Sequence, residues 1–493
     1  MIQSIGKKQI GFVLGPLLYC LVLFVFPLKD LSPEGRAVLA STVWIAVWWI
    51  TEAIPIAATA LLPIILFPLT GGISIKETVP GYSHPYIFLF IGGFILAITI
   101  EKWNLHKRMA LMIINAVGSQ KKQIILGFMV ATGFLSMWIS NTATAAMMLP
   151  IGMALVTQID DNSSGGLNSS FGKALMLAIA YSASIGGVAT LIGTPPNLIL
   201  SGVIESTYGV RITFFQWFSI GFPFAVLLLV ICWYYLTHLA FKFTDPTIPG
   251  GKKDIKRQLN ELGKMGFEEK LVLTVFVLTG LAWMLQSYIL KPLFPAIDDT
   301  IIAMTAAVVL FILPSGEKGK RLLYWEDTLR LPWGAILLFG GGIALARGFD
   351  ISGLAQWIGE QFNALEGVHV LLLLVILVAS VNFLTEITSN LATTAMILPI
   401  LASIAVVANV HPYVLMVGAA MAASCAFMLP VATPPNAIVF GSGHISISDM
   451  IRAGFMLNVL SIFLVTILVY LLLPLLWGFD ITPFPEMLRQ ITE

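Results

Sequence analysis

The sequence predicts an all-α polytopic membrane protein with about 11 transmembrane helices and two re-entrant hairpins, arranged as an inverted-topology repeat. Three observations predict this fold class: a very apolar composition, apolar runs of spanning length, and sequence blocks that occur twice. Of the 493 residues, 58% are hydrophobic and 11% are charged, whereas soluble domains have about 45–50% apolar and about 25% charged residues. We therefore expect a lipid bilayer around the chain. Its net charge of +1 argues against nucleic acid as a partner.

Eight apolar runs are continuous and approach the length of about 20 residues that a helix needs to cross a bilayer. They are 11–28, 37–54, 84–101, 213–241, 271–290, 300–314, 332–347 and 450–477. The run at 55–70 contains Pro63 and Pro68, so we expect a tilted or kinked span there. No small-residue cleavage site follows the first run, which favours a retained helix over a signal peptide.

Two further runs, 173–205 and 412–441, are each interrupted by the tetrapeptide Thr-Pro-Pro-Asn. Proline lacks a backbone N–H donor and clashes with the preceding helical turn. We therefore expect each run to unwind at its tetrapeptide. Counted as single spans, these two runs bring the expected total to eleven.

Two apolar stretches are too long for one span. Residues 123–157 and 369–408 each have a polar cluster at the centre, which begins at Ser140 in the first and at Ser389 in the second. Two short helical arms joined at a polar tip explain this pattern. Irregular backbone at membrane depth is tolerated where it is buried in protein or lines a cavity, so we expect two re-entrant hairpins.

The distribution of basic residues predicts the topology. Lys7 and Lys8 precede the first span, and basic residues recur in the longest polar segment, 242–270, which we interpret as a solvated linker. Span counting puts both segments on the same side. We therefore expect a multi-pass protein of the cell membrane with a cytoplasmic N-terminus, a first hairpin that enters from the cytoplasm and a second that enters from outside.

Three sequence blocks occur twice, in the same order. The pairs are 89–97 with 338–346, 140–151 with 389–400, and 194–202 with 433–441, and they share six of nine, nine of twelve and six of nine residues. By span counting, the two helices of the first pair run in opposite directions, so the halves are expected to be inverted copies. Inverted repeats with paired broken helices are typical of secondary transporters, whose substrate site lies near the bilayer midplane.

The hairpin tips and the breaks carry the polar chemistry of these apolar segments. Their hydroxyl, amide and freed carbonyl oxygens suit a weakly bound hard cation such as Na⁺. Helix N-termini begin just after the tips and offer N–H donors to an anion. No lysine or arginine occurs in 123–157, 174–204 or 369–441. These features favour a carrier of anions whose binding is assisted by cations.

With Ser-Asn-Thr and Ser-Asn-Leu at the tips and Thr-Pro-Pro-Asn at both breaks, the chain resembles the divalent anion–sodium symporter family. It is most similar to the bacterial INDY-type di- and tricarboxylate members, over essentially its whole length. The resemblance implies a secondary active transporter of small carboxylate anions (succinate, malate, fumarate, α-ketoglutarate, with citrate as a further candidate). It also implies coupling to Na⁺, no covalent cofactor, and an elevator motion of a transport domain against a homodimeric scaffold. The implied scaffold comprises 1–122 and 271–368, the transport domain 123–241 and 369–493, and a cytoplasmic linker 242–270 joins the halves.

The resemblance further assigns residues to binding sites. The implied first sodium site comprises Ser136, Ser140, Asn141 and the backbone of Gly193, and the second comprises Thr385, Ser389, Asn390 and the backbone of Ala432. The implied substrate-binding residues are Asn141, Thr142, Thr194, Pro195, Asn390, Leu391, Thr433 and Pro434.

Several alternatives stay open. Many family members have threonine where this chain has Leu391, so the preferred carboxylate is not fixed. The coupling mode is open between Na⁺ symport and cation-independent exchange of dicarboxylates on the same fold. An anion channel, a more distant alternative, would need a continuous polar pore, which the hairpin tips alone do not supply. We do not expect an enzyme, which would need a nucleophile with a base or a metal cluster, because the sequence shows neither. Glu386 is a candidate brace of the second tip or a proton-coupling group, and His444 either replaces a cation or lies in a loop.

Overall fold

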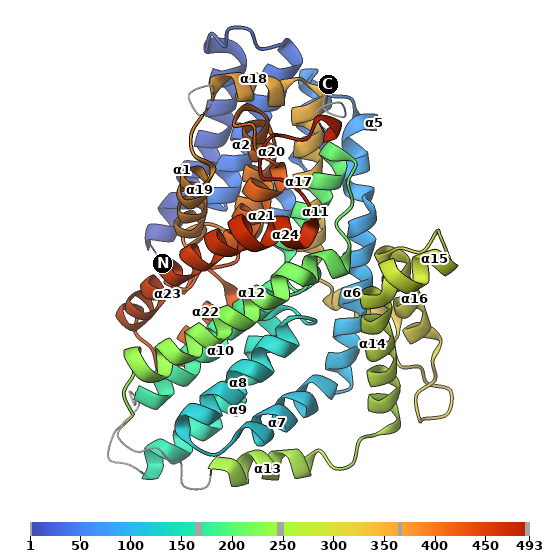
Figure 1. Ribbon diagram of the computed structural model, residues 1–493, viewed down its shortest axis with the longest axis vertical. Coiled ribbons are helices and arrows are strands. Elements are labelled where there is room, and N and C mark those ends of the chain that lie inside the picture. The colour runs from blue at the N-terminus through green and yellow to red at the C-terminus, as the bar shows by residue number, and fades with distance from the viewer. Residues whose placement is uncertain (1, 163–169, 244–250, 363–366, 489–493) are drawn as a thin grey trace.

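A computed structural model describes residues 2–162, 170–243, 251–362 and 367–488 of the chain (Figure 1). Within these ranges the regular structure is helical, apart from one isolated antiparallel bridge between Pro314 and Arg321. Eight helices of this part are long and apolar enough to cross a membrane, and five shorter apolar helices accompany them. The all-helical, multi-span character of the predicted fold is therefore confirmed.

Helices follow one another along both halves of the chain. Those of the first half are α1 (Ile2–Cys20), the π-helical turn η1 (Leu21–Val25), α2 (Pro33–Thr51), α3 (Ile56–Thr59), α4 (Leu62–Thr70), α5 (Ile75–Thr78), the 3₁₀ turn η2 (Val79–Ser83), α6 (Pro85–Lys102), α7 (Leu105–Val117), α8 (Lys121–Ser136), α9 (Asn141–Asn162), α10 (Ser170–Val188), α11 (Pro195–Tyr208), α12 (Phe214–Tyr234) and the π-helical turn η3 (Tyr235–Ala240). Those of the second half are α13 (Gly251–Glu261), α14 (Phe267–Leu285), the π-helical turn η4 (Gln286–Leu290), α15 (Lys291–Leu293), α16 (Asp299–Ile312), the 3₁₀ turn η5 (Trp325–Arg330), α17 (Trp333–Ile351), α18 (Leu354–Gln361), α19 (Val370–Thr385), α20 (Asn390–Val407), α21 (Pro412–Ala423), α22 (Pro434–Phe440), α23 (Ile447–Ile467), the π-helical turn η7 (Leu468–Leu472) and α24 (Leu473–Trp477).

Each predicted hairpin consists of two helices joined by four non-helical residues. The first tip, 137–140, separates α8 from α9, and the second, 386–389, separates α19 from α20. The expected kink in 55–70 is also present, because the helix stops at Thr59 and resumes at Leu62. Pro63 then lies in the first turn of α4, where a missing N–H costs no intrahelical hydrogen bond.

The two broken spans unwind before the prolines and not at them, which corrects the expectation from the sequence. α10 ends at Val188 and α11 begins at Pro195, while α21 ends at Ala423 and α22 begins at Pro434. Both Pro-Pro pairs therefore start a helix, where proline is favoured because its fixed φ suits the first turn. Thr194 and Thr433 are the extended N-cap residues. The unwound segments are 189–194 and 424–433.

Three helices of eight or more residues were not predicted from the apolar runs. α7 and α18 follow α6 and α17, the helices of the first duplicated block, and both are amphipathic. α13 lies within the segment 242–270 that the sequence predicted as a solvated linker, and residues 244–250 of that segment lie outside the described residues. Ile255 of α13 is buried, so this segment packs onto the protein.

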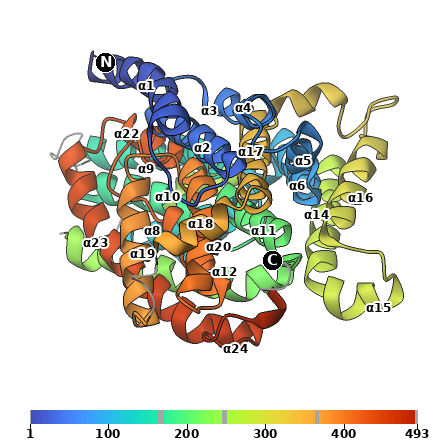
Figure 2. The ribbon, with the colours of Figure 1, turned by 90° about the horizontal axis from the view of Figure 1, so that it is seen from above.

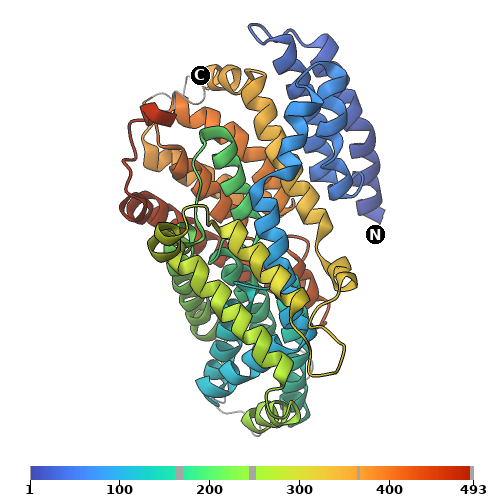
Figure 3. The same ribbon diagram turned by 90° about the vertical axis from the view of Figure 1, so that its right-hand side faces the viewer.

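The two halves of the chain pack into one another. The second arm of the first hairpin, α9, contacts the broken helix α22 of the other half, and the second arm of the second hairpin, α20, contacts α11 and α17. In Figure 2, α14, α15 and α16 lie at the right, away from α9, α19, α22 and α23 at the left. In Figure 3, the N-terminal helices, in blue, form the upper right of the molecule. The tips and breaks thus lie among helices of both halves, whereas α1–α4 and α14–α16 lie at the periphery.

Candidate functional site

At each hairpin tip, a hydroxyl residue and an asparagine are joined by a hydrogen bond across the non-helical turn. Ser136 Oγ, at the end of α8, donates to Asn141 Oδ1, at the start of α9, over 2.6 Å. Thr385 Oγ1, at the end of α19, donates to Asn390 Oδ1, at the start of α20, also over 2.6 Å. The same contact therefore closes both tips.

Each of these hydroxyls also lies beside a main-chain carbonyl of a neighbouring helix. Ser136 Oγ is 2.6 Å from the carbonyl oxygen of Ala183, and Thr385 Oγ1 is 3.0 Å from that of Ala423. A hydroxyl has a single proton, so it can satisfy only one of its two oxygen neighbours. Three oxygens with one proton among them therefore meet at each tip, and a small cation bound there would relieve the repulsion between their lone pairs.

The first break lies directly against the first tip. A Cβ added at Gly187 would lie 2.6 Å from Asn141 Oδ1, and one added at Gly193 would lie 2.5 Å from the carbonyl oxygen of Gly187. The Asn141 side chain therefore lies against the backbone at Gly187, and Gly187 lies against the backbone at Gly193. Thr190 Oγ1 donates to the carbonyl oxygen of Met137 over 2.5 Å, which ties the break to the tip a second time. The structure therefore brings Ser136, Asn141 and Gly193 together.

The asparagines of the two Thr-Pro-Pro-Asn motifs hold the unwound segments in place. Asn197 Nδ2 donates to the carbonyl oxygen of Thr190 over 2.8 Å, and Asn436 Nδ2 donates to that of Leu429 over 3.0 Å. Both residues are fully buried. An unpaired carbonyl inside the protein is costly, so these amides stabilise the non-helical backbone. The sequence analysis singled out the motif but not this role of its fourth residue.

Glu386 braces the second break. Its carboxylate accepts hydrogen bonds from the backbone N–H groups of Phe427 at 2.7 Å, Met428 at 2.9 Å and Leu429 at 3.0 Å. Asn458 Nδ2, from α23, donates to the same carboxylate over 2.8 Å. Although Glu386 is only 3% exposed, its charge is stabilised by four N–H donors, since hydrogen bonds to a buried ion offset its lost hydration. It therefore joins the second tip, the second break and α23.

The other predicted site residues differ in accessibility. Ser140 Oγ accepts a hydrogen bond from the Ala143 N–H over 3.2 Å and so caps α9. Thr142 and Pro434 are exposed, Pro195, Ser389 and Leu391 are half-buried, and Thr194, Ala432 and Thr433 are buried. The Thr433 hydroxyl accepts a hydrogen bond from the Asn436 N–H over 3.3 Å, which caps α22. Buried His444 lies in the turn between α22 and α23.

The electrostatic character of the site comes from helix ends. α9 and α20 begin at Asn141 and Asn390, and each N-terminus carries about half a positive charge and N–H groups without an intrahelical partner. α11 begins with Pro195 and Pro196, which have no N–H, so its N-terminus contributes its dipole but fewer donors. Lysine and arginine are absent from the sequence of these segments. An anion there would meet amides, hydroxyls and helix ends, and it would need a positive partner for full compensation.

Trp138, inside the first tip, packs into an aromatic cluster that the sequence did not reveal. Its ring lies 5.0 Å from Phe276 and 6.4 Å from Trp283, both on α14, and 6.0 Å from Phe214 of α12. The indole N–H is buried and has no hydrogen-bond partner among the residues that the structure describes. The contact is therefore one of ring packing, and it joins the first tip to the peripheral helix α14.

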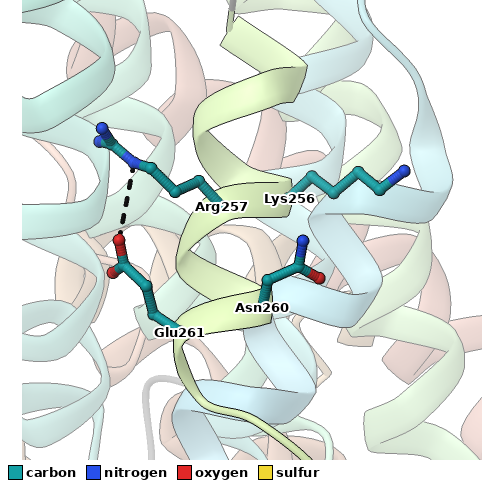
Figure 4. Close-up of a pocket in the computed structure, with 4 residues that line it drawn as sticks. All are labelled: Lys256, Arg257, Asn260 and Glu261. Atoms are coloured by element: carbon teal, nitrogen blue, oxygen red, sulfur yellow. Dashed lines mark ion pairs between the residues drawn. The ribbon is translucent and has the colours of Figure 1, made fainter.

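A shallow hollow on α13 is not part of this site. It is lined by Lys256, Arg257, Asn260 and Glu261, and Figure 4 shows these side chains spreading from one exposed helix. Arg257 and Glu261 form an i,i+4 ion pair with an Nε–Oε1 distance of 3.7 Å. Exposed pairs of this kind contribute little to stability, and the hollow lies outside the elements that contain the tips and breaks.

The protein has two duplicated tips next to two duplicated breaks within a multi-span helical fold. This arrangement is typical of secondary transporters. The chain belongs to the divalent anion–sodium symporter family, since the family described as the sodium:sulfate symporter transmembrane region matches residues 7–479.

Relatives and solved structures agree with this family and fold. The chain is 51% identical to the sodium-dependent dicarboxylate transporter SdcS of Staphylococcus saprophyticus over 487 residues, which cover 97% of this chain and 94% of the relative. It is 50% identical to SdcS of Staphylococcus aureus over the same shares. It shares its fold with the Neisseria gonorrhoeae efflux pump MtrF (TM-score 0.56, 13% identity, 93% of this chain and 98% of that chain). The Alcanivorax borkumensis transporter YdaH is comparably similar (TM-score 0.54, 13% identity, 98% and 99%).

Proposed function

We propose that this protein is a Na⁺-coupled symporter of dicarboxylates such as succinate, malate, fumarate and α-ketoglutarate. The observation that carries the proposal is the repeated oxygen cluster, in which one hydroxyl oxygen and two oxygen acceptors share a single proton at each tip. The names of the relatives, which are sodium-dependent dicarboxylate transporters, support the same assignment.

Sodium binds at the two tips in this proposal. Ser136, Ser140, Asn141 and the Gly193 backbone form the first site. Thr385, Ser389, Asn390 and the Ala432 backbone form the second. The side chains and carbonyls are neutral oxygen donors, so a monovalent cation adds a net positive charge to each tip. The site chemistry fits Na⁺ as a transported ion that leaves again, because carboxylate ligands would hold a cation more firmly.

The dicarboxylate binds between the two tips. One carboxylate meets Asn141 and Thr142 and the other meets Asn390, and Thr194, Pro195, Thr433 and Pro434 form the walls. Because these segments lack basic side chains, the substrate charge is balanced by the two bound sodium ions and by the N-termini of α9 and α20. Sodium therefore binds before the dicarboxylate, since an isolated dianion would be poorly compensated there.

Transport follows from a movement of one part of the fold against the other. The mobile transport domain comprises 123–241 and 369–493, and the scaffold comprises 1–122 and 271–368, which forms a homodimer through its peripheral helices. The halves are inverted copies, the hairpins are re-entrant from opposite sides, and the N-terminus is cytoplasmic. The matched contacts at both tips support the repeat, because they recur at the same offset as the duplicated sequence blocks.

Uptake of radiolabelled succinate into proteoliposomes of the purified full chain tests the proposal. External Na⁺ and internal dicarboxylate are varied independently. Saturable uptake into empty vesicles that requires external Na⁺ is the expected result. Uptake that requires internal dicarboxylate and ignores Na⁺ would instead identify an exchanger, and a flux that does not saturate at millimolar succinate would identify a channel.

A further inference from the structure

A second cavity lies where the C-terminal ends of α11 and α17 meet α18 and α20. It has a volume of about 700 Å³, within the range of 300–1,000 Å³ that small-molecule sites occupy. On α20 its lining begins at Pro399, nine residues after Asn390. At 1.5 Å per residue this is roughly 14 Å along the helix from the second tip, so the cavity is separate from the oxygen clusters.

The walls of this cavity are mostly apolar. Phe349 of α17, Ala402 of α20 and Val406 of α20 are lining residues, and the first two are buried. Tyr208 at the end of α11 donates its hydroxyl to the carbonyl oxygen of Ala402 over 3.3 Å, which fixes the phenol ring against one wall. An apolar body of several carbon atoms would therefore gain free energy by leaving water for this space.

The charged side chains in the described lining of this cavity are both acidic. Asp350, half-buried at the end of α17, and Glu360, exposed at the end of α18, are the ionisable lining residues. Neither carboxylate has a salt bridge within the described part of the chain, whereas Glu360 pairs with the amide of Gln356 at 3.5 Å. Arg347, one turn before Asp350, lies close enough for its charge to act on the Asp350 carboxylate, but its Nε–H donates to the carbonyl oxygen of Glu77 over 3.0 Å and it does not line the cavity.

This charge decides which ligands the cavity accepts. A dicarboxylate would be repelled by these two carboxylates, because the described lining contains no cation to offset them. A bare Na⁺ would leave the apolar walls without a partner. A cation with an apolar body satisfies both parts of the cavity, because its ammonium group can pair with Asp350 and Glu360 while its carbon atoms contact Phe349 and Val406.

We propose that this cavity binds organic ammonium ions with an apolar body, and that the bound ion inhibits transport without competing with the dicarboxylate. The second part rests on the proposed function, in which α17 and α18 belong to the scaffold and α11 and α20 to the transport domain. A ligand that contacts all four helices holds the two domains in this arrangement. The bound ion acts as a wedge, meaning that it blocks movement of one domain against the other and does not occupy the substrate site.

Binding is tested on the purified full chain in detergent, by calorimetric titration with 4-phenylbutylammonium and with the neutral 4-phenylbutanol. The amine is expected to bind saturably and about tenfold or more tightly than the alcohol, since hydrogen bonds to charged groups contribute most of the recognition. The double substitution Asp350→Asn with Glu360→Gln should weaken amine binding about tenfold or more. Glu360→Gln alone, at an exposed position, should weaken it in the same direction and leaves the buried lining intact. Glu326→Gln on exposed η5 is the matched control and should leave binding unchanged.

Equal binding of the amine and the alcohol, or amine binding that survives the double substitution, would overturn the proposal. Uptake then tests the second part: the amine should lower the maximal rate of succinate uptake and leave the succinate KM within about twofold. An increase in KM with an unchanged maximal rate would place the amine in the substrate site and contradict the wedge. The calorimetric result needs no transport activity, so failure of the proposed function and failure of this inference are distinguishable.

Discussion

At the scale of single residues, Asn141 and Asn390 combine two tasks, because each begins a helix and each presents its amide oxygen to a hydroxyl of the preceding arm. In the proposed function, removing that oxygen takes one oxygen ligand from a sodium site without changing the apolar packing of the arms. We expect Asn141→Ala and Asn390→Ala each to raise the Na⁺ concentration for half-maximal succinate uptake by about 10- to 100-fold. This range corresponds to the free energy that one contact with a charged group contributes. Uptake titrated with Na⁺ measures this.

Asn260→Ala is the matched control for these variants, since Asn260 is an exposed amide on α13. It should leave the Na⁺ dependence unchanged. Circular dichroism and size-exclusion profiles identical to the native chain would confirm that the tip variants fold. Native Na⁺ dependence in either folded tip variant would remove that asparagine from the sodium site.

Leu391 is the residue at which the motifs Ser-Asn-Thr and Ser-Asn-Leu differ, because the corresponding residue after the first tip is Thr142. Leucine offers no donor to a carboxylate, so one side of the proposed substrate site would have one fewer polar contact. We expect Leu391→Thr to change the order in which succinate, α-ketoglutarate and citrate compete with labelled succinate, with shifts of about tenfold in the inhibition constants. An unchanged competition profile would mean that residue 391 does not face the substrate.

At the scale of elements, Glu386 joins three parts of the second half through four hydrogen bonds. Glu386→Gln turns one acceptor oxygen into a donor that faces backbone N–H groups, which leaves buried donors unpaired at about 1–3 kcal/mol each. We expect a lower melting temperature and loss of succinate uptake. Asn458→Ala should act through the same network, so a thermal-stability cycle of the two single variants and the double variant should be non-additive. Additive effects would show that the two residues stabilise the break independently.

The first tip depends on ring packing in place of a carboxylate. At the offset that relates Asn141 to Asn390, the residue that matches Glu386 is Met137, and its neighbour Trp138 packs against Phe276 and Trp283 of α14. Because the indole N–H has no partner, phenylalanine can replace tryptophan without losing a hydrogen bond. We expect Trp138→Phe to retain most uptake, whereas Trp138→Ala should cost about 3–5 kcal/mol of stability and most of the uptake. Equal loss in both variants, measured by thermal unfolding and uptake, would argue for a role beyond ring packing.

At the scale of the whole molecule, the sequence predicted what depends on composition and repetition. Long apolar runs identified most spanning helices, and the duplicated motifs identified the tips and breaks. The sequence analysis missed α7 and α18 because they are short and amphipathic, and a search for continuous apolar runs does not detect such helices. The unwound segments were predicted several residues too late in the chain, because Pro195 and Pro434 start helices and do not lie in the gaps. The sequence could not predict the contact of Trp138 with α14, because the partners on α14 are more than a hundred residues away in the chain and only the fold brings them together.

The proposed division into scaffold and transport domain makes the broadest prediction, because it implies which helices move against each other. A Cβ added at Gly342 of α17 would lie 3.0 Å from the Cβ of Ala395 of α20, and one added at Gly334 of α17 would lie 3.4 Å from that of Ala57 of α3. Both separations are close to the 3.5–4.5 Å of disulfides. The first pair joins scaffold to transport domain, whereas the second lies within the scaffold.

In a background with Cys20, Cys232 and Cys425 replaced, we expect oxidised Gly342→Cys with Ala395→Cys to lose uptake by about tenfold or more, and reduction to restore it. A disulfide fixes its two Cα atoms within about 7 Å, which forbids sliding of one domain past the other. Gly334→Cys with Ala57→Cys is the matched control and should form its cross-link, verified by mass spectrometry of peptides, while uptake continues. If uptake persisted with the first cross-link complete, α17 and α20 would have to move as one body, and the mobile boundary would lie elsewhere in the fold.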